Sequence, residues 1–423
     1  MAPVVVLVKP PEQSRFNFGT FSLGVLAAAI RDIATVHILD ASAMDCSESA
    51  ARILGFAPDW IGVTTMSLTS LAPVARVIAA LRARDDSVRI VVGGHGASML
   101  PAHPLAAGAD LVVYGEGEAT FRHLLLHGTH PPIPGIAWLD HGECRTTPAM
   151  RLIEPLDSLN PPARDLMPPP VNQVHLLETS RGCPHACRFC ETTRFYGRHW
   201  RPMSPVRVAR DVRDLVEVHD AWIIEITDDN FGADKTRVLR ICELLREQEL
   251  PAFFMVSARA DDLMADTRIL PAMAGARMLR ISIGVESLVP NLAPITGKNI
   301  DPAVYRKLFA RMRELGMFSV ASFIVGLPGE PDDAGEKNLA LAIEAGPDSA
   351  QFIPFYPFPG IPLAADVDGI DPDPDAVRLA RQLTLSFYRD DQVRRRLEQA
   401  AAGNAIRAGL ARGTMEKYAT AVS

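Results

Sequence analysis

The sequence predicts an α/β protein that begins with a doubly wound, Rossmann-like domain, continues as a partial (β/α)6 barrel and ends in a short helical cap. Three observations support this fold class. Short apolar runs alternate with helix-length amphipathic stretches in two separate series, which is typical of parallel sheets. A proline-rich stretch separates the two series, and strand-like runs stop after about residue 361. We therefore expect domains at residues 1–147 and 172–361, a linker at 148–171 and a helical region at 362–423.

The first series predicts the sheet of the N-terminal domain. Its expected strands are residues 4–8, 36–40, 60–65, 88–93 and 110–115. Helical patterns at 22–34 and 71–84 lie between them. In a doubly wound sheet, ligands bind outside the carboxyl ends of the strands. The small-residue loops at 64–67, 93–96 and 115–118 are therefore expected to converge on one crevice.

The second series predicts six strand and helix units. Its expected strands are residues 174–179, 222–227, 252–257, 279–285, 318–325 and 349–355. Six units predict an open barrel, in which catalytic groups lie at the carboxyl ends of the strands. Helical spacing at 375–401, with one apolar and one charged face, predicts the cap.

Composition limits the classes of function. Hydrophobic residues make up 48% and charged residues 22% of 423 residues, as in a globular enzyme. The net charge of −7 provides no broad basic face, so we do not expect a nucleic-acid partner. The sequence has neither a signal-peptide pattern nor an apolar run of about 18 residues. We therefore expect no membrane span and a cytoplasmic location.

Three of the six cysteines fall within eight positions, directly after the first strand of the second series: Cys183, Cys187 and Cys190. Cysteines spaced in this way on a turning loop hold iron–sulfur clusters. Three ligands leave one iron of a four-iron cluster open. The alternative is a structural zinc site completed by His185 or His199. Zinc is disfavoured because the second cysteine pair that usually completes such a site is missing.

The C-x3-C-x2-C spacing, preceded by Arg181-Gly182, resembles the radical S-adenosylmethionine (SAM) superfamily over about residues 174–358. This resemblance implies a [4Fe-4S] cluster on the three cysteines, with SAM chelating the open iron. It also implies SAM contacts at the strand ends. These are Asp228 or Asp229 at the amino group, Ser257 or Arg259 at the carboxylate, Glu286 at the ribose, Phe189 at the adenine and Gly326 at the nucleoside.

These polar residues also have ordinary interpretations. Asp228 and Asp229 would be suitable caps for the helix that follows them. Arg259 is close enough in sequence to Asp261 or Asp262 to form a solvated ion pair. Their shared position at strand ends after a cysteine loop favours the SAM site.

The N-terminal domain lacks both a G-x-G-x-x-G turn after its first strand and a phosphate-binding loop, so NAD and ATP are disfavoured. Its segments 21–24, 61–67, 92–95 and 114–118 resemble those of cobalamin-binding radical SAM enzymes. The cobalamin contacts that this implies are Leu23, Thr64, Thr65, Met66, Ser67, Leu68, Gly93, Gly94, His95, Gly117 and Glu118. The D-x-H-x-x-G pattern is absent, which leaves the lower axial ligand open. His95 either ligates cobalt, contacts the nucleotide tail of the cofactor or turns the chain.

The resemblance implies a methyltransferase acting on an unactivated carbon or phosphorus, through methylcobalamin and a 5′-deoxyadenosyl radical. Alternatives are a cobalamin-dependent cyclase or ring-rearranging enzyme without methyl transfer, and a non-catalytic cobalamin or redox sensor. The implied partners are a small-molecule or natural-product substrate and an external electron donor such as flavodoxin or ferredoxin.

Overall fold

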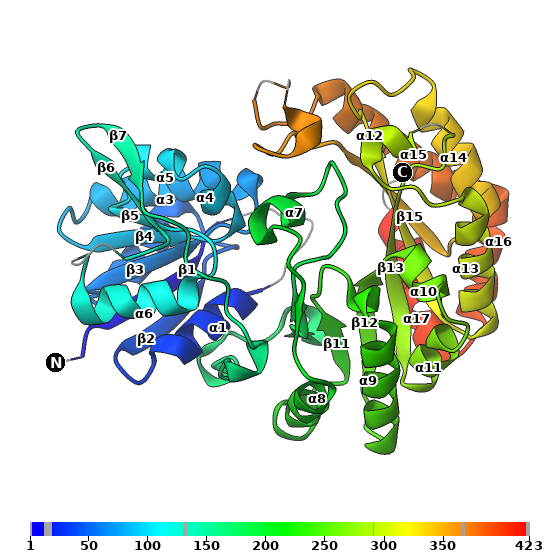
Figure 1. Cartoon of the computed structure of the whole chain (residues 1–423), viewed down its shortest axis with the longest axis horizontal. Helices are drawn as coiled ribbons and strands as arrows, with labels where there is room; N and C mark the ends of the chain where they lie inside the picture. The colour runs from blue at the N-terminus through cyan, green and yellow to red at the C-terminus, as the bar shows by residue number, and fades with distance from the viewer. Residues whose placement is uncertain are drawn as a thin grey trace. The chain divides into compact units, whose positions relative to one another are not determined.

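The computed structural model describes residues 2–11, 19–129, 133–290, 292–365, 367 and 369–419. It divides into two compact units, Met1–Asn172 and Gln173–Ser423. Each unit has its own sheet with a parallel core (Figure 1). The α/β fold class expected from the sequence is confirmed.

The sheet of the first unit has the strand order β2-β1-β3-β4-β5-β6-β7. The bounds are β1 Val4–Lys9, β2 Thr35–Asp40, β3 Trp60–Thr64, β4 Arg89–Gly93, β5 Leu111–Val113, β6 Ile136–Asp140 and β7 Glu143–Thr146. Strands β1 to β5 pair in parallel and match the five expected strands. The antiparallel strands β6 and β7 were not predicted. They are short, and their pairing depends on tertiary contacts rather than on a long apolar run.

Helices cover both faces of this sheet (Figure 1). Their bounds are α1 Phe21–Ile30, α2 Cys46–Leu54, α3 Leu71–Arg82, α4 His95–Met99, α5 Ala102–Ala106 and α6 Gly117–His127. One apolar cluster joins α2, α3 and α5 to one face of the sheet, and a second joins α1 and α6 to the other. Burial on both faces explains why β1, β3 and β5 are continuous apolar runs.

The proline-rich segment expected as a linker packs against α1. The backbone N–H of Ala163 donates to the carbonyl of Gly24 at 2.9 Å. Arg31 of α1 forms an ion pair with Asp165 at 2.7 Å. This part of the segment is therefore an ordered component of the first unit.

The second unit has a six-stranded parallel sheet of order β15-β14-β13-β12-β11-β8. The bounds are β8 Val174–Leu177, β11 Ile223–Ile226, β12 Phe253–Ala258, β13 Met278–Glu286, β14 Phe318–Val325 and β15 Ser349–Pro354. The six expected strands are confirmed, and β8 and β15 are unpaired edges, so the barrel is open. The antiparallel pair β9 Ser180–Arg181 and β10 Arg201–Pro202, which closes the cysteine loop, was not predicted.

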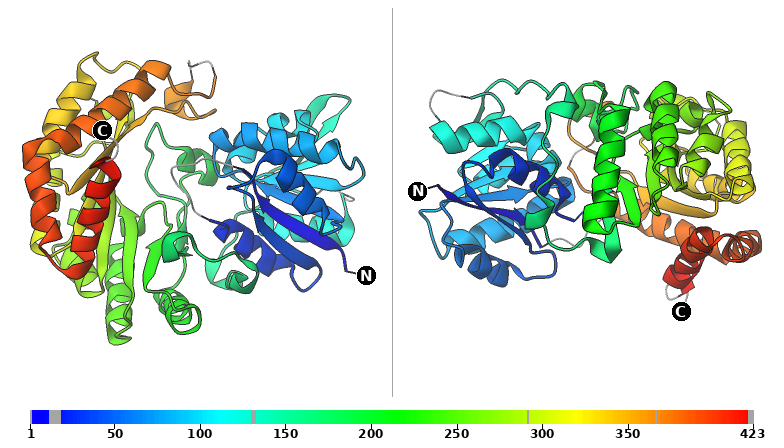
Figure 2. Two further views of the ribbon diagram at one scale, coloured as in Figure 1. Left: turned by 180° about the vertical axis from the view of Figure 1, so that it is seen from behind. Right: turned by 90° about the horizontal axis from the view of Figure 1, so that it is seen from below.

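In its described residues, the second unit has eight labelled helices before the cap, of which α8, α9, α11, α13 and α14 line the outer side of the curved sheet (Figures 1 and 2). Their bounds are α7 Glu191–Tyr196, α8 Pro205–His219, α9 Lys235–Glu247, α10 Ala260–Met264, α11 Ile269–Gly275, α12 Ala293–Thr296, α13 Pro302–Glu314 and α14 Ala334–Ala345. Strand side chains alternate between buried and partly exposed, as expected for a sheet with helices on one face.

The C-terminal cap consists of α15 Pro374–Arg389, α16 Asp391–Ala401 and α17 Ala405–Ala419. The helical cap expected from the spacing at 375–401 is confirmed, and the structure divides this stretch into two helices. Asp390 has an extended backbone, and its side chain accepts hydrogen bonds from the N–H groups of Gln392 and Val393. An aspartate in this conformation ends one helix and caps the next.

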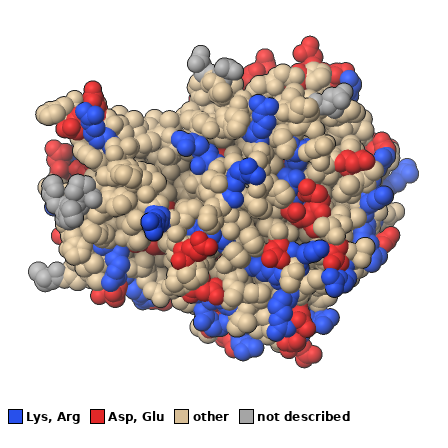
Figure 3. Space-filling view, in the orientation of Figure 1, with Lys and Arg blue, Asp and Glu red and all other residues tan. Residues whose placement is uncertain are grey.

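No helix among the described residues is long and apolar enough to cross a membrane. Lysine and arginine side chains are interspersed with acidic ones over the face visible in Figure 3.

Candidate functional site

The cysteine loop follows β8 and β9 at the carboxyl edge of the second sheet. Gly182 opens the loop with a φ of +83°, and a Cβ there would lie 2.3 Å from the carbonyl oxygen of His199. This close approach requires glycine. The loop continues through three partly buried cysteines, and α7 begins directly after Cys190.

Backbone and carboxylate contacts hold the loop in place. The N–H of Cys190 donates to the carbonyl of Cys187 at 3.3 Å, and the N–H of Arg188 donates to Thr296 at 2.9 Å. Asp229 accepts from the N–H of Gly182 at 3.2 Å and from the hydroxyl of Thr192 at 2.8 Å. One carboxylate thus joins the start of the loop to the helix that follows it.

The donor set of the loop fits a cluster better than zinc. In the described part of the chain, no three His, Cys, Asp or Glu side chains are arranged to hold a single metal ion. The Nε2 of His185, a candidate fourth zinc ligand, instead contacts Asp262 at 2.9 Å. A four-iron cluster binds each thiolate through a separate iron, so its ligands do not have to converge on one point.

The three thiols differ in their surroundings. Burial raises the pKa of Cys183 and Cys187, and it raises the pKa of Cys190 to about 11. The positive charges of Lys298 and Arg259 oppose this increase at Cys187, whereas the Asp229 carboxylate adds to it at Cys183 and Cys190. Metal binding must therefore displace protons that these thiols hold firmly in the free protein.

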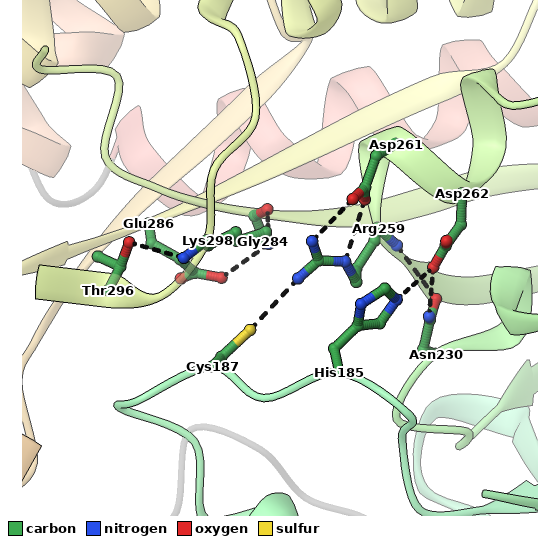
Figure 4. A network of polar contacts seen from close by, with 10 residues as sticks. All are labelled: His185, Cys187, Asn230, Arg259, Asp261, Asp262, Gly284, Glu286, Thr296 and Lys298. Atoms are coloured by element: carbon green, nitrogen blue, oxygen red, sulfur yellow. Dashed lines mark hydrogen bonds and ion pairs between the residues drawn. The ribbon is translucent and has the colours of Figure 1, made fainter. Parts of the chain in front are cut away.

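Arg259 connects the end of β12 to the cysteine loop (Figure 4). Its Nε and Nη2 donate to Asp261 at 3.0 and 2.8 Å, so the ion pair with Asp261 forms. Its Nη1 donates to the sulfur of Cys187 at 3.3 Å. Asn230 accepts from the Arg259 N–H at 3.2 Å and donates to Asp262 at 2.6 Å. Asn230 and Asp262 thereby hold the strand end that carries Arg259, a role not predicted from the sequence.

Glu286 lies at a bulge at the end of β13, with a φ of +66°. Its Oε1 accepts from the ammonium of Lys298 at 3.2 Å, and the same ammonium donates to the carbonyl of Gly284 at 2.5 Å. Both charged side chains are nearly buried, with 5% of Lys298 and 11% of Glu286 exposed. The sequence offered no signal for Lys298, because it lies in an irregular segment between α12 and α13.

Asp228, which follows β11, is hydrogen-bonded to the start of β9 and to the residue before it. It is buried, and its two oxygens accept four hydrogen bonds of 2.6 to 2.9 Å from the N–H and hydroxyl groups of Thr179 and Ser180. The helix that follows is capped by Asp234, not by Asp228 or Asp229. Of the two candidate aspartates, Asp229 is therefore the one in contact with the cysteine loop.

The other three expected SAM contacts lie at different strand ends. Ser257 is partly exposed on β12, in register with Ser282. Phe189 packs against a small apolar cluster that includes Leu327 and Phe355. Gly326 was expected to approach the nucleoside, and in the structure its backbone lies close to α15. A Cβ at Gly326 would lie 2.6 Å from the Cβ of Ala376.

The carboxyl edge of the first sheet brings its three expected loops into contact. The Thr65 hydroxyl donates to the Gly93 carbonyl at 2.7 Å and accepts from the N–H of Ala97 at 2.8 Å. Gly94 has a φ of +93°, and a Cβ there would lie 2.3 Å from the Thr65 carbonyl oxygen. The N–H of Gly115 donates to the Ser98 hydroxyl at 3.0 Å, which adds the third loop.

The remaining expected cobalamin residues occupy the same edge in different ways. Leu23 and Leu68 are buried, and Thr64 ends β3. Met66 is partly exposed, Ser67 contacts the hydroxyl of Thr69 at 2.7 Å, and Gly117 and Glu118 begin α6. His95 begins α4, and burial lowers its pKa to about 4. Its imidazole is therefore neutral at physiological pH.

This edge suits a corrin nucleotide tail. The order of the strands reverses between β1 and β3, and doubly wound sheets bind nucleotides at such a point. Glycines at 93, 94 and 115 keep side chains off the loops, and a Cβ at Gly115 would meet nothing within 4 Å. Residues 12–18 of the loop after β1 lie outside the described residues.

Comparison with known proteins finds a family match in each of the two units. Residues 177–342 match the model of the Radical SAM superfamily, and residues 14–125 match that of the B12 binding domain. An uncharacterized methyltransferase of Pyrococcus horikoshii is 29% identical over 380 residues, which cover 85% of this chain and 82% of that protein. The anaerobic magnesium-protoporphyrin IX monomethyl ester cyclase of Rubrivivax gelatinosus is 26% identical over 77% of this chain and 61% of the cyclase.

The fold is also similar to a solved structure. The radical SAM methyltransferase TsrM from Kitasatospora setae, with cobalamin and a [4Fe-4S] cluster bound, superimposes with a TM-score of 0.72. The match covers 87% of this chain and 75% of that one, at 18% identity. The two domain matches assign three cofactors to this chain: a [4Fe-4S] cluster, SAM and cobalamin.

Proposed function

Since this chain belongs to the cobalamin-binding radical SAM enzymes, we propose that it is a methyltransferase acting on an unactivated carbon or phosphorus of a small molecule. One observation carries the proposal. The Pyrococcus horikoshii relative aligns over most of both chains and is named an uncharacterized methyltransferase, whereas the chain spans only 61% of the aligned cyclase. A second structure of TsrM contains tryptophan as substrate, which supports a small molecule as the methyl acceptor.

The cysteine loop is the cluster-binding element of the proposal. Cys183, Cys187 and Cys190 would hold the cluster, and Asp229 fixes the loop that carries them. When bound, the three cofactors supply electron transfer, radical formation and the methyl group. An external donor such as flavodoxin or ferredoxin would deliver the electron. The protein's part is to position these groups and to keep water from them.

Three groups at the strand ends are suited to orient SAM. We assign Asp229 to its amino group, because each oxygen of Asp228 already accepts two hydrogen bonds from the fold, whereas each oxygen of Asp229 accepts one. We assign Arg259 and Ser257 to its carboxylate. Glu286 is assigned to the ribose, with Lys298 holding its carboxylate in position. Phe189 and Gly326 remain the assignments for the adenine and the nucleoside.

The edge of the first sheet is assigned to cobalamin. Small residues and hydroxyls on its loops would admit the nucleotide tail and the lower corrin face: Leu23, Thr64, Thr65, Met66, Ser67, Leu68, Gly93, Gly94, His95, Gly117 and Glu118. A neutral His95 can accept a hydrogen bond there. We assign His95 to the tail because it follows the tightly packed Gly94.

The test is the fate of the SAM methyl group. Anaerobic protein, reconstituted with iron, sulfide and hydroxocobalamin, is incubated with methyl-deuterated SAM, reduced flavodoxin and candidate small molecules. A methyltransferase yields S-adenosylhomocysteine together with a product that carries the labelled methyl. Formation of 5′-deoxyadenosine and a changed, unlabelled product, without S-adenosylhomocysteine, would contradict methyl transfer.

The cyclase alternative rests on the similarity to the Rubrivivax enzyme over 341 residues. It predicts a product with a new ring and no label from SAM. The same incubation therefore separates the two reactions. A protein that cleaves no SAM under these reducing conditions would instead fit a sensor.

A further inference from the structure

The two faces of the second sheet differ in chemistry. Side chains that point toward the helices are apolar and buried, as at Ile226, Val256 and Ile281. The opposite face carries polar side chains that are partly exposed: Glu225, Ser257, Arg280, Ser282, Ser322 and Gln351. Closed β/α barrels fill this inner face with apolar side chains. A polar inner face in an open barrel is the chemistry of a binding surface.

Arg280 is the cation of this face. In register it lies between Met255 of β12 and Phe318 of β14, both of which are buried. These neighbours remove water from the guanidinium, and this burial lowers the pKa of Arg280. An arginine remains charged in proteins all the same. The side chain keeps 26% of its surface exposed, so a dissolved ligand can reach it.

The partners of Arg280 leave most of its donors unused. Its Nη1 lies 3.8 Å from the Glu225 carboxylate, which is beyond hydrogen-bonding distance, and 3.8 Å from the Met255 sulfur. Among the described residues, Arg280 donates no hydrogen bond to an oxygen. Two other poorly exposed arginines of this unit each have a carboxylate within hydrogen-bonding distance. Arg259 bonds Asp261 through two nitrogens, and Arg407 bonds Asp348 at 2.7 Å.

We propose that Arg280 binds an anionic group of the substrate, a carboxylate or a phosphate, on the inner face of this sheet. Arg280 is partly buried, and its ion pair with Glu225 at 3.8 Å is too long for a hydrogen bond. A bidentate anion would supply the hydrogen-bonded counter-charge that the guanidinium lacks. Ser257, assigned above to SAM, is two residues beyond the register partner of Arg280, or about 7 Å along a strand. The anion would thus anchor the end of the substrate that does not react.

That the anion belongs to a substrate rests on the proposed function. The test of anion binding itself needs no turnover. The protein is loaded with cluster, cobalamin and SAM, so that the SAM site is filled. Acetate and inorganic phosphate are then titrated separately by calorimetry. The Arg280→Gln variant is expected to lose about tenfold or more in affinity for the anion that the wild type binds. The better of the two probes identifies the anion as carboxylate or phosphate.

Two variants control the experiment. Arg277→Gln removes the same charge at an exposed position just before β13 and should bind as the wild type does. Arg280→Lys keeps the charge but cannot offer two parallel donors, so its affinity should be intermediate. Iron content and near-ultraviolet circular dichroism establish that each variant is folded and loaded.

Several outcomes would overturn the inference: neither probe binds the wild type, Arg280→Gln binds as well as the wild type, or Arg277→Gln loses as much affinity. These outcomes are separate from failure of the proposed function. A wild type that transfers no methyl group, yet binds the anion through Arg280, refutes only the methyltransferase.

Discussion

The two sheets of this chain bury their faces in different ways. The first is covered on both faces, and β1, β3 and β5 are almost wholly buried. The second is covered on one face only, and its other face carries Glu225 and Arg280. The first sheet can therefore bind a ligand only at its carboxyl edge, through loops. The second offers both an edge and a face, and thus room for a cofactor and a substrate.

The two edges are also built differently. At the first edge, hydroxyl and backbone groups interlock the loops, as in the contacts of Thr65 with Gly93 and Ala97. At the second edge, charged side chains fix the loops, as in the contacts of Arg259 and Lys298. Loops that are joined through hydroxyl and backbone groups suit a large cofactor that is held by shape. Charged groups suit a small zwitterion such as SAM. A substitution that disrupts the contacts of one edge should leave those of the other edge intact.

The largest expected effect is at the cysteine loop. Cys187→Ser should lose the cluster, so that iron falls to trace levels and SAM cleavage falls to background. The visible absorbance of bound cobalamin should remain after desalting, because the first sheet is unchanged. Cys144→Ser, at a partly buried cysteine of β7, should retain both cofactors. Full iron content in Cys187→Ser would mean that another residue serves as the ligand.

The next effect is on stability at the second edge. Lys298→Met removes one partner of a nearly buried ion pair and leaves the Glu286 carboxylate without its cation. Breaking such a pair costs about 4 kcal/mol of unfolding free energy. Urea denaturation of the variant should show this loss. The double variant Lys298→Met with Glu286→Gln should recover part of it, because no buried charge is left. Equal loss in both variants would point to packing instead.

Long apolar runs were sufficient to predict most of the fold, and the cysteine spacing predicts the metal ligands. Those signals are local, because a buried strand or a cluster loop needs its residue types close together in sequence. Lys298 meets Glu286 across 12 positions through a bulge, and the sequence carries no trace of that contact. Arg280 did carry a signal, since it is a charge near the start of a strand whose other residues, apart from Ser282 and Glu286, are apolar. Its meaning depends on which face lacks helices, and only the fold shows this.

A smaller effect is expected at the first edge. Gly94→Ala places a Cβ against the Thr65 carbonyl, at a φ of +93° and a ψ of −177°. Only glycine adopts this conformation readily, so the cost is about 3 kcal/mol. Gly115→Ala also has a positive φ, but its Cβ meets nothing, and about 1 kcal/mol is expected. Hydrogen exchange should show faster opening of β3 and β4 in Gly94→Ala, with β12 and β13 unchanged. Faster exchange throughout the chain would mean that the two sheets unfold together.

The smallest effect is a pH dependence that arises from His95 at the first edge. Burial lowers the pKa of His95 from 6.5 to about 4. Between these two pH values, His95 is therefore mostly protonated in the unfolded chain and mostly neutral in the folded chain. Stability is therefore complete above about pH 6.5 and falls as the pH drops toward 4. Between about pH 7 and pH 5.5 the loss is about 1 kcal/mol. Hydrogen exchange of β4 in apoprotein should show this slope, and His95→Gln should abolish it. A slope that survives in His95→Gln would assign the proton to another group. A slope of the same size in β13 would remove the distinction between the two edges.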